Sequence, residues 1–242
     1  IFNRPSTNQW YCSLSKSVSF DSLDIAAKTG GADFVSTVIV KHREAWILGL
    51  FTSEIWSLVG GADFPFAPNQ GAFMDHGNIA KYSIAKVDVS VFWLSQDSSG
   101  RGIVMQSKGY QADIISTRAL ENEIQGYARI DDAIAYIFQQ GGHTFYVLIF
   151  PQADKTWVYD LSTKQWHEWL YIDNNGKLHR HRGNCYAFMH GENVVIDYQN
   201  GNLYAIDPDK HTDNGQPIAR LRSFPHVMAN GNRVSISRIL AD

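Results

Sequence analysis

The densest group of histidines in the sequence is His179 and His181 with nearby His167 and His190, and histidine is a common metal ligand. Alternation along a strand would put His179 and His181 on one face, and a metal site would need a third ligand at about the same depth. Arg180 and Arg182 lie between and beside these two histidines, and their charges would repel a cation. We therefore expect a polar loop here and assign no metal site.

Three aspartates farther along the chain have spacings loosely like those of a calcium loop. They are Asp207, Asp209 and Asp213, and Asn214-Gly215 follows them. The closing Glu of a calcium loop is missing from this stretch. Pro208 and Gly215 favour ordinary turns, so we expect turns here.

A pair of adjacent acids, Asp131-Asp132, could be imagined as a glycosidase acid and base, with Glu121 and Glu123 nearby in the sequence. That mechanism needs two carboxyl groups that face each other across a sugar. Adjacent aspartates on a strand point to opposite faces, so they cannot form such a pair by themselves. Solvated charge at the end of a strand is the interpretation we favour.

Motifs of nucleophilic and nucleotide-dependent chemistry are absent, since the sequence has no GxSxG, GxGxxG or Walker loop. Cys12 and Cys185 are far apart and belong to no CxxC pair, which indicates neither a zinc site nor a disulfide framework. A reduced compartment is therefore expected. We assign no catalytic, cofactor-binding or metal-binding residue and predict that the protein is not an enzyme.

One basic run stands out, formed by Arg180, His181 and Arg182 with Lys177. A net charge of -3 gives the chain no general affinity for nucleic acid. A protein interface rich in arginine explains the run as well as contact with DNA does. We expect nucleic acid to be at most an indirect partner.

The composition indicates the kind of fold that positions these polar residues. The chain has 242 residues, of which 44% are hydrophobic, 13% aromatic and 19% charged. That is enough apolar material for one large core, and the aromatic surplus suits strands better than helices. No apolar run approaches the length of a membrane span, and residues 1–30 lack the regions of a signal peptide, so no membrane partner is expected.

Short apolar runs separated by turns predict a series of antiparallel meanders. After an irregular segment at 1–30, with a strand possible near Trp10, the predicted strands are 34–40, 44–51, 54–59, 81–84, 87–94, 102–106, 112–115, 130–138, 145–150, 156–159, 186–189, 193–197, 202–206 and 233–237. The third strand of the meander at 145–159 would begin near Trp166, and 64–77 reads as a connection bearing proline and glycine. Residues 117–125 predict one short helix on a rim, because a Ser/Thr cap precedes Leu120 and Ile124, which are four apart.

The meanders repeat along the chain. The aromatic residues assigned to second strands, Trp46, Phe92, Tyr146 and Phe188, are 46, 54 and 42 residues apart by subtraction of their numbers. The residues assigned to third strands are Trp56, Val104, Trp157 and Val195. Periods of about 40 to 50 residues with about four strands are typical of β-propellers. We therefore predict an all-β fold, a β-propeller of four-stranded antiparallel blades, with about four complete blades and further partial ones.

A β-sandwich is the alternative, since its strands also alternate and turn at short intervals. The repeat period favours the propeller. In that fold Trp46, Trp93 and Trp157 would fill the space between blades, and Trp166 and Trp169 are the candidates for exposure.

The order of many short motifs resembles the packaged-DNA stabilisation proteins of short-tailed phages, which are also called tail accessory or tail hub proteins. The segments that carry this resemblance lie between about Trp10 and Asp207 and are Trp46-Ile47-Leu48-Gly49, Glu54-Ile55-Trp56, Trp93-Leu94, Ile114-Ile115-Ser116-Thr117, Gly142 to Leu148, Phe150-Pro151, Thr156 to Asp160 and Trp166-His167-Glu168.

The resemblance implies a structural subunit that joins a ring under a portal and adaptor protein, carries the tail needle and keeps packaged DNA from leaking. It implies location in the virion tail after assembly in the bacterial host cytoplasm, often from a prophage, and no catalytic residues. The chain starts without Met and stops just after a strand-like run, so we expect a single domain over 1–242 that is a fragment of a longer protein. The alternatives are a propeller glycosidase or carbohydrate-binding module, and a cellular propeller that scaffolds other proteins.

Overall fold

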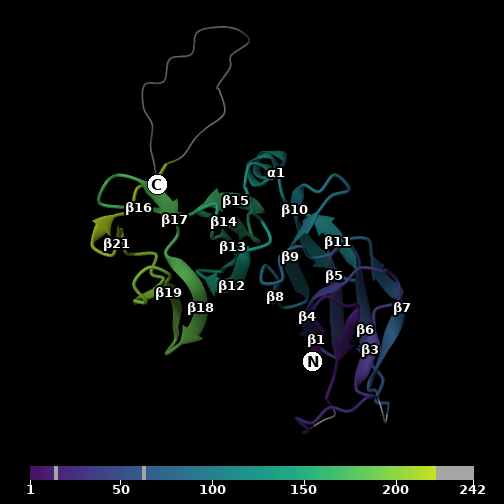
Figure 1. Cartoon of the computed structure of the whole chain (residues 1–242). Helices are drawn as coiled ribbons and strands as arrows, with labels where there is room; N and C mark the ends of the chain where they lie inside the picture. The colour runs from purple at the N-terminus through teal and green to yellow at the C-terminus, as the bar shows by residue number, and fades with distance from the viewer. Residues whose placement is uncertain (14–15, 62–63, 222–242) are drawn as a thin grey trace.

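The computed structural model describes residues 1–13, 16–61 and 64–221, and these residues form an all-β fold with one short helix (Figure 1). Antiparallel sheets follow one another along the chain, and each is a meander whose strands pair with their neighbours in sequence. The strand predicted at 233–237 lies outside the described residues.

Three sheets have four strands each. The first contains β4 (Val35–Lys41), β5 (Glu44–Gly49), β6 (Ser53–Leu58) and β7 (Phe66–Met74). The second contains β8 (Ala85–Val87), β9 (Ser90–Gln96), β10 (Gly102–Lys108) and β11 (Gln111–Ile114). The third contains β12 (Ile134–Gln140), β13 (His143–Phe150), β14 (Lys155–Asp160) and β15 (Gln165–Glu168). These sheets confirm the predicted four-stranded antiparallel blades.

The remaining sheets are smaller. A three-stranded sheet follows the third blade and contains β18 (Gly183–Met189), β19 (Glu192–Asp197) and β20 (Leu203–Ala205). Another precedes the first blade and contains β1 (Phe2–Asn3), β2 (Gln9–Tyr11) and β3 (Ile25–Ala27). Two hairpins complete the fold, β16 (Leu170–Ile172) with β17 (Leu178–Arg180), and β21 (Thr212–Asp213) with β22 (Gln216–Pro217). Within the described residues three blades, not four, are therefore complete.

Strand β5 of the first blade is buried on both faces because a sheet lies on each side. In β5, Trp46 and Leu48 share a core with Trp93 of the second blade, and both are fully buried. The alternate residues Ala45 and Ile47 share a different core with Trp10 of β2. A strand packed in this way has a continuous apolar sequence in place of an alternating one.

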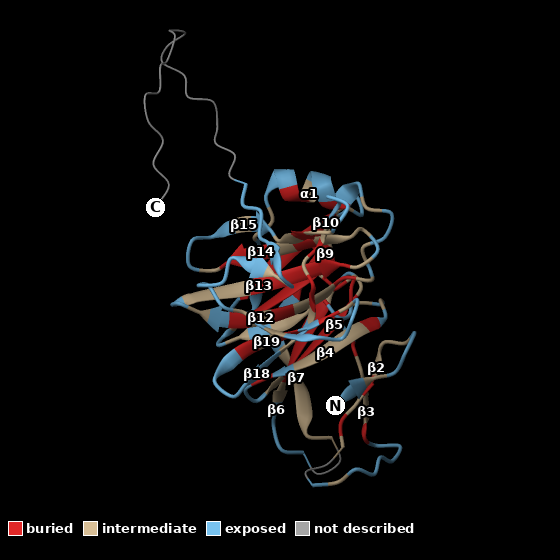
Figure 2. Cartoon of the chain, turned by 90° about the vertical axis from the view of Figure 1, so that its left-hand side faces the viewer, coloured by how far each residue is buried: buried red, intermediate tan, exposed pale blue. Residues whose placement is uncertain are grey.

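The same arrangement repeats along the chain, and the buried strands lie in the middle of the molecule in Figure 2. Phe92 of β9 and Tyr146 of β13 meet in the core between the second and third blades, with ring centroids 5.3 Å apart. Val147 and Val195 lie in the core between the third blade and β18–β20. The prediction that Trp46 and Trp93 fill the space between blades is confirmed.

Helix α1 (Arg118–Gln125) connects the second and third blades and lies at the top of the coloured ribbon in Figure 1. The Thr117 hydroxyl accepts a hydrogen bond from the Leu120 amide at 3.3 Å and so caps the first turn. Leu120 and Ile124 are buried against the sheets, and Gly126 ends the helix. The predicted rim helix is confirmed.

Two stretches differ from the prediction. The connection expected at 64–77 contains β7, which is an edge strand of its sheet. Proline is tolerated on an edge strand because one side of that strand has no partner strand, so Pro68 is compatible with β7. The single strand expected at 87–94 is divided by a turn, in which Asp88 has a φ of 47°. At 81–84 the structure has one isolated bridge, from Tyr82 to Ile134, in place of a strand.

The predicted alignment of the fourth repeat is wrong by one strand. Phe188 lies on β18, the first strand of its sheet, and is 67% exposed, whereas Val195 lies on β19, the second strand. Val195 is therefore the residue equivalent to Tyr146. The inserted hairpin β16–β17 delays the start of this sheet, and the residue pattern alone did not show it.

Candidate functional site

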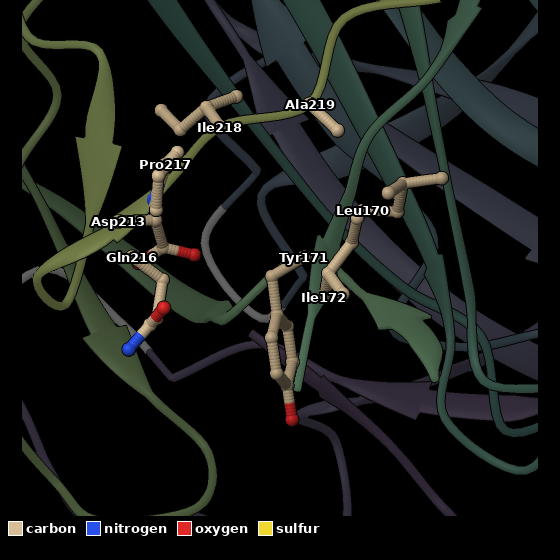
Figure 3. Close-up of a pocket in the computed structure, with 8 residues that line it drawn as sticks. All are labelled: Leu170, Tyr171, Ile172, Asp213, Gln216, Pro217, Ile218 and Ala219. Carbon is tan, nitrogen blue, oxygen red and sulfur yellow. The ribbon is translucent and has the colours of Figure 1, made fainter. Parts of the chain in front are cut away.

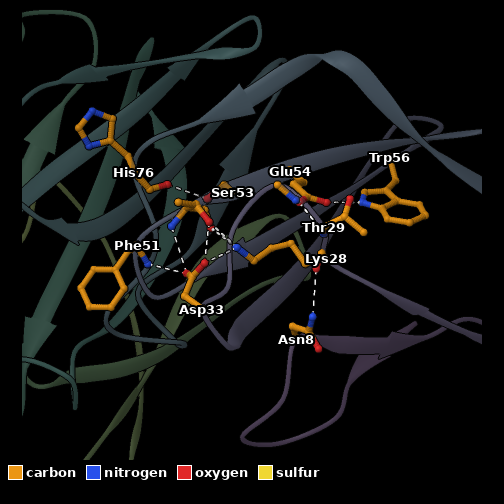
Figure 4. A network of polar contacts seen from close by, with 11 residues as sticks. Asn8, Lys28, Thr29, Asp33, Phe51, Ser53, Glu54, Trp56 and His76 are labelled. Carbon is orange, nitrogen blue, oxygen red and sulfur yellow. Dashed lines mark hydrogen bonds and ion pairs between the residues drawn. The ribbon is translucent and has the colours of Figure 1, made fainter.

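A buried polar cluster joins the segment after β3 to the first blade (Figure 4). The ammonium group of Lys28 pairs with the carboxylate of Asp33 and donates to the Thr52 hydroxyl. The other Asp33 oxygen accepts hydrogen bonds from the amides of Phe51 and Thr52 at 2.7 and 3.1 Å. Burial raises the pKa of Asp33, but these hydrogen bonds lower it more, to about 2.

Glu54 extends this cluster, with a residue exposure of 6%. One carboxylate oxygen accepts hydrogen bonds from the amides of Thr29 and Gly30, and the other accepts one from the Trp56 indole at 3.1 Å. Each carboxylate in the cluster already binds groups of the protein, so the arrangement holds β1–β3 against the first blade. The sequence analysis singled out neither Lys28 nor Asp33. These two residues are 5 positions apart, and no sequence motif distinguishes a buried ion pair of this kind from two exposed charges.

The structure does not bring the four histidines together. His179 on β17 lies between two carboxylates, with Nδ1 2.7 Å from Asp154 and Nε2 3.4 Å from Asp173. His181 follows β17, and its Nδ1 accepts a hydrogen bond from the Gly183 amide at 3.1 Å. Desolvation lowers the pKa of His181 to about 4. Among the described residues, no three His, Cys, Asp or Glu side chains form a cluster suited to a metal ion.

The basic run is largely internal. Arg180 and Arg182 are 7% and 8% exposed, although the sequence suggested an interface or DNA contact. The Arg182 guanidinium binds Asp197 at 3.2 Å and Asp213 at 3.0 Å, and it stacks 3.8 Å from the Tyr171 ring. Arg180 also stacks on an aromatic ring, 3.7 Å from that of Tyr198. The two arginines of the basic run therefore hold the region around β16–β17 together, because arginine pairs with carboxylates and aromatic faces.

The predicted turns at 207–215 are confirmed, since the Asp207 carboxylate accepts a hydrogen bond from the Asp209 amide at 2.9 Å and Asn214-Gly215 forms the turn between β21 and β22. Asp213 is separate and pairs with Arg182. The acids considered for a glycosidase are also engaged elsewhere. Asp131 pairs with Arg129, and Asp132 accepts a hydrogen bond from the Gln152 amide at 2.9 Å.

The remaining acids of that group bind other residues as well. Glu121 accepts a hydrogen bond from the Ser116 hydroxyl at 2.9 Å, and Glu123 lies 4.0 Å from Lys155. No two of these carboxylates are brought into a shared site by any contact among the described residues.

Two small hollows lie at the surface of the described part of the molecule. One, of about 10 Å³, lies between β16 and the β21–β22 hairpin, with Tyr171 and Ile172 on one side and Asp213 and Gln216 on the other (Figure 3). It has room for about one water molecule. The other, of about 200 Å³, lies beside the end of α1, and its two arginines, Arg101 and Arg129, pair with Asp97 and Asp131. Sites for small-molecule ligands are usually larger than either.

The aromatic residues expected at the surface are only partly exposed. The Trp166 indole donates a hydrogen bond to the Ile115 carbonyl at 2.8 Å, and Trp169 packs against Phe138 and Phe145. Trp157, assigned to blade packing, is half-buried and donates to the Tyr127 hydroxyl at 2.9 Å. Cys12 is buried and Cys185 is exposed, and both are free thiols.

In the part of the chain that the structure describes, the helix is too short and too polar to cross a membrane. The polar clusters around Lys28 and Arg182 serve the packing of neighbouring segments. Among the residues described, these contacts leave no assembled group of catalytic side chains.

Comparison with known proteins gives one family. The family model described as bacteriophage P22 Gp10, a β-propeller of the phage stabilisation type, matches residues 1–211. No curated protein matches the chain. Among solved structures, the extracellular domain described for a one-component system of B. thetaiotaomicron is similar over 79% of this chain and 25% of that one, with 13% identity and a TM-score of 0.34. The chain thus spans about a quarter of that structure's length.

Proposed function

Because the chain belongs to the bacteriophage P22 Gp10 family of stabilisation β-propellers, we propose that it assembles under the portal and adaptor ring of a short-tailed phage or prophage. There it helps to close the channel, retains packaged DNA and provides an attachment for the tail needle. Its partners are the portal, adaptor and needle proteins and further copies of itself, and DNA contributes at most indirectly. Its place is the tail of the virion, after assembly in the bacterial host cytoplasm.

The observation that carries this proposal is the extent of the family match, which covers residues 1–211 and so includes every sheet from β1–β3 to β18–β20. The contacts of the polar residues support a structural role as well. Asp33, Glu54 and Arg182 bind other residues of the chain, and such fully paired groups are not available to a substrate.

An alternative function in carbohydrate binding or hydrolysis has less support. A lectin site needs exposed aromatic rings beside convergent polar groups, and a glycosidase needs two facing carboxyl groups. Trp166 and Trp169 are packed against the protein, and Asp131 is paired with Arg129. A cellular scaffold is the third possibility, and the phage family is evidence against it.

The proposal is tested with phage particles that have packaged DNA but lack their tail accessory protein. Such particles are incubated with the purified chain, and the DNA that becomes accessible to nuclease is measured over time. We expect the chain to slow DNA release and to sediment with the portal–adaptor complex. An unrelated β-propeller of similar size is the control. If the chain neither sediments with the complex nor slows release beyond this control, the proposal is wrong.

A further inference from the structure

The hairpin β21–β22 has an asparagine followed by a glycine in its turn. Asn214 and Gly215 have φ angles of 48° and 80°, and Asp213 pairs with Gln216 across the two strands. Positive φ at both central residues is the mark of a type I′ turn, for which Asn-Gly is a preferred sequence. Both turn residues are exposed, so water reaches the Asn214 carboxamide. Glycine has no side chain that would hinder approach to its backbone nitrogen.

An asparagine side chain in such a sequence can react with the backbone of the next residue. The Gly215 nitrogen attacks Cγ of Asn214, the new C–N bond closes a cyclic imide, and the bond from Cγ to Nδ2 breaks. The Gly215 amide proton leaves with Nδ2 as ammonia. Water then adds to one of the two imide carbonyl groups, so that opening at Cγ gives aspartate and opening at the backbone carbonyl gives isoaspartate. Water is the co-reactant, and no electrons are gained or lost.

The described part of the chain contains other Asn-Gly pairs, and their glycine amides are engaged. The pairs there are Asn175-Gly176, Asn200-Gly201 and Asn214-Gly215, and a further one, Asn230-Gly231, lies outside the described residues. The Gly176 amide donates a hydrogen bond to the Asp173 carbonyl at 3.0 Å. The Gly201 amide donates one to the Asp197 carbonyl at 3.2 Å. The Gly215 amide has no hydrogen-bond partner among the described residues.

The turns at Asn175 and Asn200 are also held more firmly than the turn at Asn214. The hairpins β16–β17 and β19–β20 each have three paired positions, whereas β21–β22 has two. The Asn200 carboxamide oxygen accepts a hydrogen bond from the Asn202 amide at 2.8 Å. The reacting nitrogen must move onto Cγ, which requires the turn to open, and short hairpins open at a low free energy.

We propose that Asn214 is a site of spontaneous deamidation through attack by the Gly215 amide. The folded chain protects Asn175 and Asn200 from the same reaction, because the glycine that follows each of them would first have to lose its backbone hydrogen bond. This inference is independent of the proposed function, since it concerns a chemical change within the chain itself.

Isoaspartate at this turn changes the contacts of the neighbouring Asp213. The Asp213 carboxylate binds the Arg182 guanidinium at 3.0 Å, and its hairpin faces Tyr171 of β16 across the small hollow in Figure 3. Isoaspartate adds a carbon atom to the main chain of a two-residue turn, so Asp213 and Gln216 no longer pair in the same register. Arg182 retains its ion pair with Asp197 at 3.2 Å. We expect β21–β22 to loosen from β16 while β18–β20 stays in place.

The test is incubation of the full 242-residue chain in mildly alkaline buffer, followed by peptide mapping with mass spectrometry. Isoaspartate in each peptide is detected by methyl transfer from an isoaspartyl methyltransferase. In the folded chain Asn214 should deamidate roughly tenfold or more faster than Asn175 and Asn200, because its turn opens at the lowest free energy. In guanidinium chloride the three sites should react at similar rates, because unfolding removes the protecting hydrogen bonds.

Two variants sharpen this test. Asn214→Gly removes the reactive carboxamide and suits the positive φ of the turn, so the peptide that contains position 214 should form no isoaspartate. Asn175→Ala is the matched control and should leave the reaction at Asn214 unchanged. Circular dichroism confirms that both variants are folded. The inference is overturned if Asn175 or Asn200 reacts as fast as Asn214 in the folded chain, or if Asn214 reacts no faster there than they do.

The structural consequence has its own measurement. The isoaspartyl fraction of the chain is separated by ion exchange, and amide hydrogen exchange is compared between it and the unmodified fraction. Exchange over residues 212–217 should be faster in the isoaspartyl fraction, and exchange in β19 should be unchanged. Equal exchange of residues 212–217 in the two fractions would overturn the loosening of β21–β22.

Discussion

The ammonium group of Lys28 and the carboxylate of Asp33 form an ion pair that is shielded from water, with side-chain exposures of 0% and 9%. Removal of one partner would leave the other charge buried without compensation. We expect Asp33→Asn to lower the free energy of unfolding by about 3 to 5 kcal/mol in urea denaturation. The control is Asp131→Asn, which removes an exposed pair with Arg129 and should cost less than about 1 kcal/mol. Equal effects of the two substitutions would contradict the structural role of the buried pair.

The same carboxylate predicts a dependence of stability on pH. The pKa of Asp33 is about 2 in the folded protein, below its ordinary 3.8, because the hydrogen bonds from Lys28, Phe51 and Thr52 outweigh the opposite effect of burial. A lowered folded-state pKa contributes stability that is present above the unfolded-state pKa and is lost as the pH falls toward 2. We expect wild type to lose about 2 kcal/mol through this group between about pH 5 and pH 2.

The measurement is urea unfolding across that pH range, with Asp33→Asn as the comparison. The variant lacks the titrating group, so its stability should fall less steeply by about the same amount. Parallel curves for the two proteins would show that Asp33 does not titrate as expected.

Two buried tyrosines differ in one hydrogen bond and provide a matched pair. The Tyr146 hydroxyl donates to the Ser83 carbonyl at 2.8 Å, whereas the buried Tyr136 hydroxyl has no hydrogen-bond partner among the described residues. Tyr146→Phe should therefore cost about 1 to 2 kcal/mol, and Tyr136→Phe should leave stability unchanged or raise it slightly. Thermal and chemical unfolding of both variants checks this, and a larger loss for Tyr136→Phe would contradict the assignment.

Gly77 lies in close contact with the backbone of another turn. A Cβ atom at this position would come within 2.3 Å of the Leu50 carbonyl carbon and the Phe51 amide nitrogen, and the Gly77 carbonyl accepts a hydrogen bond from the Trp93 indole at 2.9 Å. We expect Gly77→Ala to destabilise the protein by about 2 kcal/mol or more. At Gly71 the nearest atom is 3.9 Å away, so Gly71→Ala should be tolerated. Urea denaturation of the two variants measures both changes in the free energy of unfolding.

The fold could be predicted from the sequence where an element is marked by residues within it or directly beside it, such as an apolar run bounded by turns or a helix cap. The run from Phe145 to Phe150 and the helix capped by Thr117 are examples, since both depend on nearby residues. Strand β7 was missed because Pro68 and Gly71 are typical of loops, and the position of β7 at the sheet edge makes them acceptable in a strand. The hairpin β16–β17 was missed because its strands are three residues long.

The polar contacts were less predictable, because they join residues that are distant in the chain. His179 meets Asp154 across 25 residues, and Arg182 meets Asp213 across 31. A run of basic residues therefore suggested an exposed interface, although the folded chain buries Arg180 and Arg182. Spacing within one strand indicates which face a side chain takes, but the partner comes from the arrangement of sheets.

The order of contacts between sheets has a consequence for how the protein unfolds. Each sheet shares a core with the sheets next to it in the chain, so the free energy that holds a sheet in place comes from local pairing and nearest neighbours. Among the residues that the structure describes, β1–β3 and β18–β20 each share a core with one other sheet, whereas the second blade shares cores with two. Amide hydrogen exchange should therefore be slowest in β9 and β13 and faster toward both ends, as opening begins at the ends and moves inward.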